Sequence, residues 1–269
     1  MSDPLRKRIV TAALLIALLL IVLLALPVAA TVVLLTLTVL AGAWEWSAFL
    51  KVRGPWLRAV YVLAVAVLLP LAWLASGDLE GLRLLLGGAL LWWLVALAWI
   101  VIAPHRVRPW SAGAAGLFAL VPAWIALMRL RLAPGQGADW VLFVLLLVWA
   151  ADIGAYFIGH HFGRRRLAPR VSPGKTWEGA MGGATASVPV ALAGAYWFRL
   201  PPAFVGLCLL AVGFSIVGDL TESLLKRFAG MKDSGTLFPG HGGVMDRIDS
   251  LTGAAPVLLL GLTFLGVLP

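Results

Sequence analysis

The chain has few of the residues that soluble or disulfide-linked proteins require. Only 12% of its 269 residues are charged, whereas 62% are hydrophobic. A composition this apolar excludes an ordinary soluble domain and is typical of a polytopic membrane protein. Cys208 is the single cysteine, so the chain can form neither an internal disulfide nor a cysteine-based metal site.

Long polar stretches are also scarce. A membrane-spanning helix needs about 20 apolar residues, and nine segments qualify as candidates. The first follows a basic triplet, as a signal peptide would, but it runs into the second without a small-residue cleavage pattern, so we interpret it as a retained helix. We predict an all-α membrane bundle forming one domain over residues 1–269. Its candidate spans are residues 9–26, 28–50, 56–76, 83–103, 110–130, 140–160, 178–198, 203–227 and 246–267. The first five spans, roughly 9–130, are expected to be the scaffold, and residues 140–267 are expected to carry catalysis.

Acidic residues are too few to balance the basic ones, which leaves a net charge of +9. The distribution of this charge argues against a nucleic-acid partner. With a cytoplasmic N-terminus, the connections on the inner side hold 17 of the 21 Lys and Arg residues. This positive-inside bias predicts a cytoplasmic N-terminus and a C-terminus on the outer side.

Residues 223–249 are the exception to the apolar pattern. These 27 residues hold seven of the 33 charged side chains, one histidine and five glycines. Charge beside lipid is costly and usually functional. The mixture of carboxylates, cations and glycines predicts a metal-dependent site for phosphates.

The predicted helix before this loop carries a polar stripe at its end. Asp219, Glu222, Ser223 and Lys226 are spaced so that they share one helical face. An internal ion pair between Glu222 and Lys226 would explain two of them. It would not explain Asp219, which lies one turn deeper and is therefore interpreted as functional.

The loop itself and the start of the last helix add further candidates. Glycines 240, 242 and 243 would let backbone amides approach an anion. Asp246 and Asp249 share a face of the last helix; the helix dipole alone could explain one of them. Together with Asp219 they could form a carboxylate cage for a hard cation, and magnesium prefers such oxygen ligands.

A second polar loop covers residues 163–179. Its Gly174-Lys175-Thr176 triplet resembles the end of a phosphate-binding P-loop, but Pro169 stands where that motif needs glycine, so we reject this interpretation. Residues 172–178 resemble a capped helix start, which can bind phosphate. Lys175 and Thr176 are the preferred ligands here, whereas Arg164–Arg166 are interpreted as topology determinants. Asp152, in the preceding helix, is either a site residue or a helix contact, and Gly179 with Gly183 indicates close helix packing.

The polar positions form a long pattern, Ser223-x2-Lys226-Arg227-x4-Lys232-Asp233-x-Gly235-x2-Phe238-Pro239-x-His241-Gly242-Gly243-x2-Asp246-Arg247-x-Asp249. It resembles the signature of phosphatidate cytidylyltransferases, and Ser172-Pro173-x-Lys175-Thr176-x-Glu178-Gly179 is similar to a second block of that family. The resemblance implies that CTP and phosphatidic acid give CDP-diacylglycerol and pyrophosphate. It also implies Mg2+, with a monovalent cation such as K+ beside it, a cytoplasm-facing site in the cell inner membrane, and a homodimer.

The resemblance further implies that Asp219 and Asp246 bind the catalytic metal, and we expect Asp249 to be a third ligand or to support them. Phosphates would be neutralised by basic residues, and the triphosphate would be held by the polar loops. The expected catalytic residues are Asp219, Asp246, Lys226, Lys232 and His241; the expected substrate-binding residues are Ser172, Lys175, Thr176, Glu178, Ser223, Arg227, Gly242, Gly243 and Arg247.

Two other functions compete with this interpretation. An ion-coupled transporter could use Glu45, Asp152 and Asp219 as an ion path, although the chain shows no clear internal repeat. A CTP-dependent lipid-alcohol kinase would use CTP differently, because the lipid alcohol would attack the γ-phosphorus and CDP would be released.

Overall fold

The computed structural model describes residues 3–52, 54–237 and 242–268. These residues form nine α-helices, two short η segments and one two-stranded antiparallel hairpin. The helices are α1 (Asp3–Leu20), α2 (Val28–Trp46), α3 (Pro55–Ala75), α4 (Leu79–Ile102), α5 (Pro109–Arg131), α6 (Gly137–Phe162), α7 (Trp177–Trp197), α8 (Ala203–Ala229) and α9 (Met245–Phe264). The other elements are η1 (Ile21–Ala25), η2 (Ser47–Leu50), β1 (Arg166–Ala168) and β2 (Ser172–Thr176).

The all-α fold predicted from the sequence is confirmed, because each predicted apolar segment corresponds to one helix. The hairpin β1–β2 was not predicted. Its strands are too short and too polar to show an alternating pattern, and they occupy what the sequence suggested was an irregular loop.

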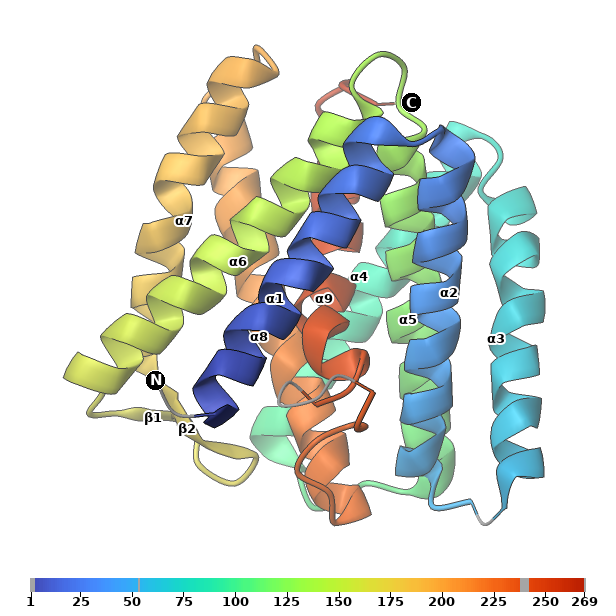
Figure 1. Ribbon diagram of the computed structural model, residues 1–269, viewed down its shortest axis with the longest axis vertical. Coiled ribbons are helices and arrows are strands. Elements are labelled where there is room, and N and C mark those ends of the chain that lie inside the picture. The colour runs from blue at the N-terminus through green and yellow to red at the C-terminus, as the bar shows by residue number, and fades with distance from the viewer. Residues whose placement is uncertain (1–2, 53, 238–241, 269) are drawn as a thin grey trace.

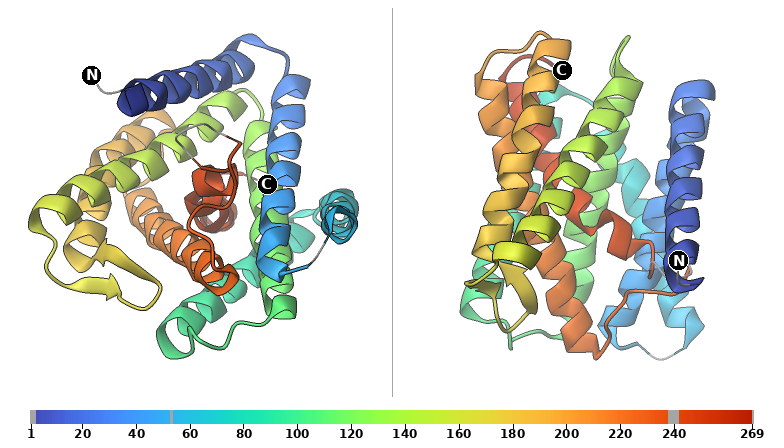
Figure 2. Two further views of the ribbon diagram at one scale, coloured as in Figure 1. Left: turned by 60° about the horizontal axis from the view of Figure 1, so that its bottom comes forward. Right: turned by 60° about the vertical axis from the view of Figure 1, so that its left-hand side comes forward.

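Helix α9 is the centre of the bundle. It contacts α8, α5, α4, α6 and α2, and the stretch 250–260 is buried throughout. Figure 2 shows α9 in red, enclosed by the other helices when the bundle is viewed toward one end. The last helix is therefore a core element, and the polar residues at its start are held from several sides.

Six helices in the described ranges are long and apolar enough to cross a membrane. They are Val28–Leu50, Pro55–Ala75, Leu79–Ile102, Pro109–Arg131, Gly137–Phe162 and Ala203–Ala229. A shorter apolar helix covers Val10–Ala25. Helices α7 and α9 lie where spans were predicted, but α7 is rich in glycine and α9 begins with three charged residues. Their crossing of the membrane, and hence a total of nine spans, stays a prediction.

The basic connections gather at one end of the bundle. In Figure 1 the connections α2–α3 and α4–α5, the hairpin β1–β2 and the end of α8 lie at the lower end, and the connections α1–α2, α3–α4, α5–α6 and α7–α8 lie at the upper end. This alternation agrees with the separation of charge that the sequence predicts.

Helices α6 and α7 pack closely through glycine. A Cβ atom on Gly179 would lie 3.0 Å from the Ala155 carbonyl oxygen, and one on Gly183 would lie 2.6 Å from that of Ala151. The packing role predicted for Gly179 and Gly183 is confirmed. The pair of helices carries the hairpin β1–β2 at its lower end (Figure 1).

The chain turns back into the bundle between α8 and α9. Helix α8 ends at the lower end of Figure 1, and α9 begins higher in the bundle. The start of α9 therefore lies beside the last turns of α8 and beside the end of α2.

Candidate active site

Helices α8 and α9 cross at two glycines, next to the predicted carboxylates. A Cβ atom on Gly218 would lie 2.5 Å from the Asp249 carbonyl oxygen and 3.3 Å from the Gly253 nitrogen. A Cβ atom on Gly253 would likewise overlap the carbonyl of Phe214. Because only hydrogen atoms separate the two backbones here, Asp219 and Asp249 are held near each other.

Asp219 forms an ion pair with Lys175. The Lys175 ammonium group contacts Asp219 Oδ2, and the two side chains are 26% and 30% exposed. The Ser223 hydroxyl lies 3.4 Å from Asp219 Oδ1. The contact joins the end of β2 to α8, so the structure brings the two polar segments of the sequence together at Lys175 and Asp219.

Lys226 is shared by two carboxylates. Its Nζ atom lies 2.5 Å from Glu222 Oε2 and 2.7 Å from Asp246 Oδ1. The Glu222 side chain is only 1% exposed. The ion pair between Glu222 and Lys226 considered from the sequence is therefore present, but it also includes Asp246 from α9.

The second carboxylate oxygen of Asp246 accepts hydrogen bonds from residues that lie between α8 and α9 in the chain. The Gly243 N–H donates to Asp246 Oδ2 at 2.8 Å, and the Ser234 N–H donates to the same oxygen at 3.0 Å. The Ser234 hydroxyl also lies 3.0 Å from it. The Gly243 amide was expected to bind a phosphate, but in the structure it donates a hydrogen bond to Asp246.

The hairpin β1–β2 is fastened to the start of α7. Thr176 is the N-cap of α7, because its Oγ1 accepts the Gly179 N–H at 3.1 Å. Glu178 Oε2 accepts the backbone N–H groups of Arg164 and Arg165 at 3.0 and 3.1 Å. The capped helix start predicted over 172–178 is confirmed in its C-terminal part, whereas Ser172–Thr176 forms a strand.

Several predicted residues lie at the edge of this arrangement. Arg227, Lys232 and Arg247 are exposed, Gly242 has a φ of 79° beside Asp246, and Ser172 is half-buried. His241 and Gly240 lie outside the described residues. Arg227 and Arg247 directly follow Lys226 and Asp246 in the chain, so an incoming polyanion could contact these exposed cations next to that ion pair.

Asp152 of α6 belongs to the same surroundings. Its Oδ1 atom lies 3.5 Å from the Ser250 hydroxyl of α9. This polar contact with α9 fits the helix contact considered from the sequence, and a role of Asp152 in the site stays a prediction.

The carboxylates of three neighbouring helices are the type of ligand that a hard divalent cation requires. Asp152, Asp219 and Asp249 supply carboxylate oxygens from three helices, and magnesium takes such ligands. Among the described residues, however, no three His, Cys, Asp or Glu side chains are close enough to hold one ion. The metal role of Asp219, Asp246 and Asp249 therefore stays a prediction.

Glu45 is the residue whose role sequence reasoning missed. It is 7% exposed, at the end of α2, and its carboxylate accepts hydrogen bonds from Ser234, Val244 and Met245. The available signal was a single carboxylate between Trp44 and Trp46 in an otherwise apolar span. Its partners lie 189 to 200 residues away in the chain, so no local pattern could identify them.

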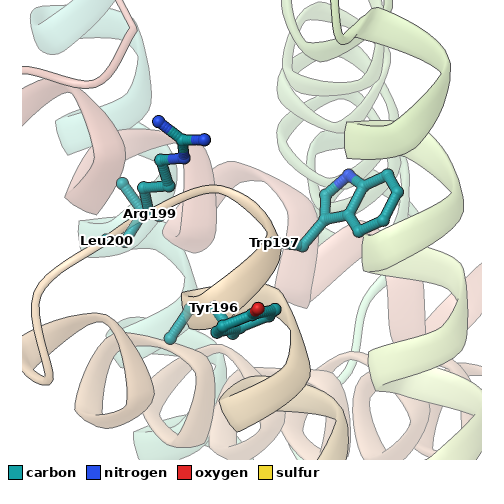
Figure 3. Close-up of a pocket in the computed structure, with 5 residues that line it drawn as sticks. Tyr196, Trp197, Arg199 and Leu200 are labelled. Atoms are coloured by element: carbon teal, nitrogen blue, oxygen red, sulfur yellow. The ribbon is translucent and has the colours of Figure 1, made fainter.

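One hollow lies away from the ion pairs. It is about 490 Å³, at the far end of α7, and is lined by Ala195, Tyr196, Trp197, Arg199 and Leu200 (Figure 3). Arg199 is its one charged residue, and the labelled side chains point in different directions. This hollow lacks the carboxylates that a phosphate-transfer site with a metal would need.

Comparison with known proteins identifies the relatives of the chain. The sequence model of the Cytidylyltransferase family matches residues 6–265. A phosphatidate cytidylyltransferase of Pseudomonas aeruginosa is 45% identical over 261 residues, which covers 94% of this chain and 95% of that protein. One from Haemophilus influenzae is 38% identical over 277 residues, with 94% and 96% covered. One from Bacillus subtilis is 41% identical over 116 residues, covering 42% of this chain and 43% of that protein. With a family match across nearly its whole length and relatives this similar end to end, the chain belongs to the Cytidylyltransferase family.

Proposed function

We propose that the protein is a phosphatidate cytidylyltransferase, which joins the cytidylyl group of CTP to phosphatidate and releases pyrophosphate. Family membership over residues 6–265 and two relatives of that name, each covering 94% of the chain, support the activity. One structural observation supports its location. The ion pairs Lys175–Asp219 and Lys226–Asp246 both involve the C-terminal half of α8, and α8 ends at the same end of the bundle as the basic connections.

The proposed reaction joins two polyanions. A phosphate oxygen of phosphatidate forms a bond to the α-phosphorus of CTP, and the bond from that phosphorus to the β-phosphate bridging oxygen breaks. Pyrophosphate leaves with the electron pair. Because a phosphate monoester has its second pKa at about 6, the nucleophile is already ionised at neutral pH, and no strong general base is required. Catalysis then depends on positioning and on neutralising charge.

The basic residues divide into two groups by burial. Lys175 and Lys226 are held by carboxylates and are partly buried, so their positions are fixed. Arg227, Lys232 and Arg247 are exposed around them. We assign the exposed group to attracting and neutralising the triphosphate, and the two partly buried lysines to orienting phosphate oxygens next to Asp219 and Asp246.

The polar hairpin is assigned to the nucleotide. Lys175 lies at its end, and Ser172 and Thr176 belong to the same strand. Glu178 fixes the hairpin to α7 through the two backbone N–H groups it accepts, so its assigned role is to shape the phosphate-binding segment. The remaining proposed site residues are His241, Gly242 and Gly243, which lie between α8 and α9 in the chain.

Magnesium is the proposed cofactor, with Asp219, Asp246 and Asp249 as the residues that would hold it and a monovalent cation such as K+ beside it. Bound magnesium would supply positive charge to the phosphates during transfer. The carboxylate-rich surroundings of Asp219 support this proposal, since oxygen ligands are the ones that magnesium prefers.

The apolar helices make the chain a multi-pass membrane protein. We propose the cell inner membrane, with the N-terminus and the site on the cytoplasmic side and the C-terminus outside. The basic connections at the lower end of Figure 1 support this orientation, because cytoplasmic loops carry an excess of Lys and Arg. We also propose a homodimer, on the family resemblance alone; the mass of the purified protein in detergent tests it.

The decisive experiment uses the purified protein, phosphatidate, magnesium and CTP labelled at either the α- or the γ-phosphate. Label from the α-position should enter the lipid, label from the γ-position should leave as pyrophosphate, and a chelator should stop the reaction. In a parallel assay with diacylglycerol in place of phosphatidate, entry of γ-label alone would instead show a lipid kinase. Transfer of neither label, by a protein that remains folded, would contradict the proposed function. The comparisons support neither the kinase nor the transporter.

A further inference from the structure

Glu45 connects the scaffold helices to the loop that carries the proposed catalytic residues. Its carboxylate accepts the Val244 N–H at 3.0 Å, the Met245 N–H at 2.9 Å and the Ser234 hydroxyl at 2.8 Å. All three donors belong to the loop after α8 or to the start of α9. A buried carboxylate with this many donors is held in one position, because each lost hydrogen bond would leave a polar group unsatisfied.

Glu45 supplies the cap that α9 lacks in its own sequence. The N-cap residue of α9 is Val244, whose side chain cannot accept a hydrogen bond. The first N–H groups of a helix have no partner within it and carry its positive end. A carboxylate from α2 therefore satisfies two of these donors and favours the start of α9 at this place.

Ser234 passes this connection on to Asp246. Its hydroxyl lies 2.8 Å from Glu45 Oε2 and 3.0 Å from Asp246 Oδ2, and it is 3% exposed. A hydroxyl has one proton, so it donates to one carboxylate at a time. The Ser234 N–H also donates to Asp246, which keeps the serine between the two acids.

Two glycines leave the room that the Glu45 carboxylate occupies. A Cβ atom on Gly235 would overlap Glu45 Oε1, and one on Gly243 would overlap Glu45 Oε2 and the Ser234 hydroxyl. These glycines lie in the segment that resembles the family signature. The Glu45 carboxylate therefore explains why Gly235 and Gly243 lack side chains, whether or not these glycines also contact a phosphate.

We propose that Glu45 is a positioning residue for the transfer reaction: it fixes Ser234 and the start of α9 so that Asp246 stays against Lys226. This inference rests on the proposed function, because it assumes that Asp246 takes part in transfer. It adds a residue from α2, in the half of the chain that the sequence suggested was only scaffold.

The test compares Glu45→Gln, Ser234→Ala and the double variant. Glutamine keeps the shape of the side chain but replaces one acceptor oxygen by a donor, which would face an N–H of α9. We expect kcat to fall about 10- to 100-fold, the range that one charged hydrogen bond carries, with KM for CTP changed less than about twofold. Because both substitutions break the same connection, their effects should not add. The kcat of the double variant should lie within about twofold of the kcat of the less active single variant.

Two controls separate positioning from stability. Phe49→Leu alters a fully buried residue close to Glu45 without touching its hydrogen bonds, and Glu80→Gln removes an exposed carboxylate from the first turn of α4. Activity is measured well below the melting temperature of every variant. Amide hydrogen exchange over residues 231–247 should accelerate in Glu45→Gln and stay unchanged in Glu80→Gln.

Unchanged kcat in folded Glu45→Gln, or a loss no greater than in a Phe49→Leu variant of equal melting temperature, would overturn the proposal. If Glu45→Gln does not fold, Ser234→Ala decides, since it keeps the bonds from α9 to Glu45; normal kcat there would refute the connection. A wild-type protein that makes no CDP-lipid would refute the proposed function instead. The exchange and the melting temperatures of the single and double variants would still measure whether Glu45 and Ser234 are coupled.

Discussion

Lys226 neutralises two buried carboxylates at once, and replacing it by methionine tests whether this charge balance holds the site together. Methionine has a similar length but no charge. In the variant, Glu222 and Asp246 would keep their places on α8 and α9 without the ammonium group that lies 2.5 and 2.7 Å from them. Two carboxylates would then face each other in a poorly hydrated region.

The structure sets the size of the effect. The side chains of Glu222 and Asp246 are only 1% and 9% exposed, so water cannot replace the lost cation. Removing one partner of a buried ion pair costs about 3–5 kcal/mol. Because two carboxylates lose their partner, we expect Lys226→Met to lower the free energy of unfolding by about 4–5 kcal/mol. At about 2–4 °C per kcal/mol, the melting temperature should fall by about 8–20 °C.

Tryptophan fluorescence during heating in detergent measures this change. Adding Glu222→Gln to Lys226→Met removes one of the two stranded charges and should restore about 2 kcal/mol. Lys51→Met is the matched control: Lys51 is exposed, its Nζ lies 4.0 Å from the ring centroid of Phe228, and such a contact carries only about 0.5–1 kcal/mol. Equal melting temperatures for Lys226→Met and Lys51→Met, or no rescue by Glu222→Gln, would refute the reasoning.

Three further variants test other parts of the structure. Asp246→Asn should lower turnover of labelled CTP by about 10²–10³-fold or more, while gel filtration in detergent shows a folded protein; near-normal activity would contradict its place in the site. Lys175→Ala should raise KM for CTP about tenfold with little change in kcat, and an unchanged KM would remove Lys175 from the nucleotide site. Gly218→Leu should push α8 away from α9 and lower stability by about 1–3 kcal/mol, whereas Gly213→Leu, where a Cβ atom would meet nothing within 4 Å, should leave the melting temperature nearly unchanged. A Gly213 variant as unstable as the Gly218 variant would argue against the close crossing.

The helices could be predicted because burial in lipid or in the bundle needs only long apolar segments, and these are visible in the sequence. Lys175 and Asp219 were each predicted as candidate site residues, but their pairing was not predicted. The local sequence around β2 does not indicate which helix packs beside it. Gly243 illustrates the harder case. The sequence suggested that its amide binds phosphate, but that amide donates to Asp246 while the missing side chain makes room for Glu45. Such a role depends on a residue of another helix and could not be derived from spacing along the chain.

The contact between the backbones of α8 and α9 at Gly218 and Gly253 has a consequence for the behaviour of the protein in different bilayers. Helices usually tilt to match the thickness of the surrounding lipid. With a pivot fixed at these glycines, we expect the distal portions of both helices to adjust their tilt while the separation of Asp219 and Asp249 stays nearly constant. The geometry of the proposed site near these glycines would then be little affected by the acyl-chain length of the surrounding lipid. The distal ends of the two helices would change their tilt instead.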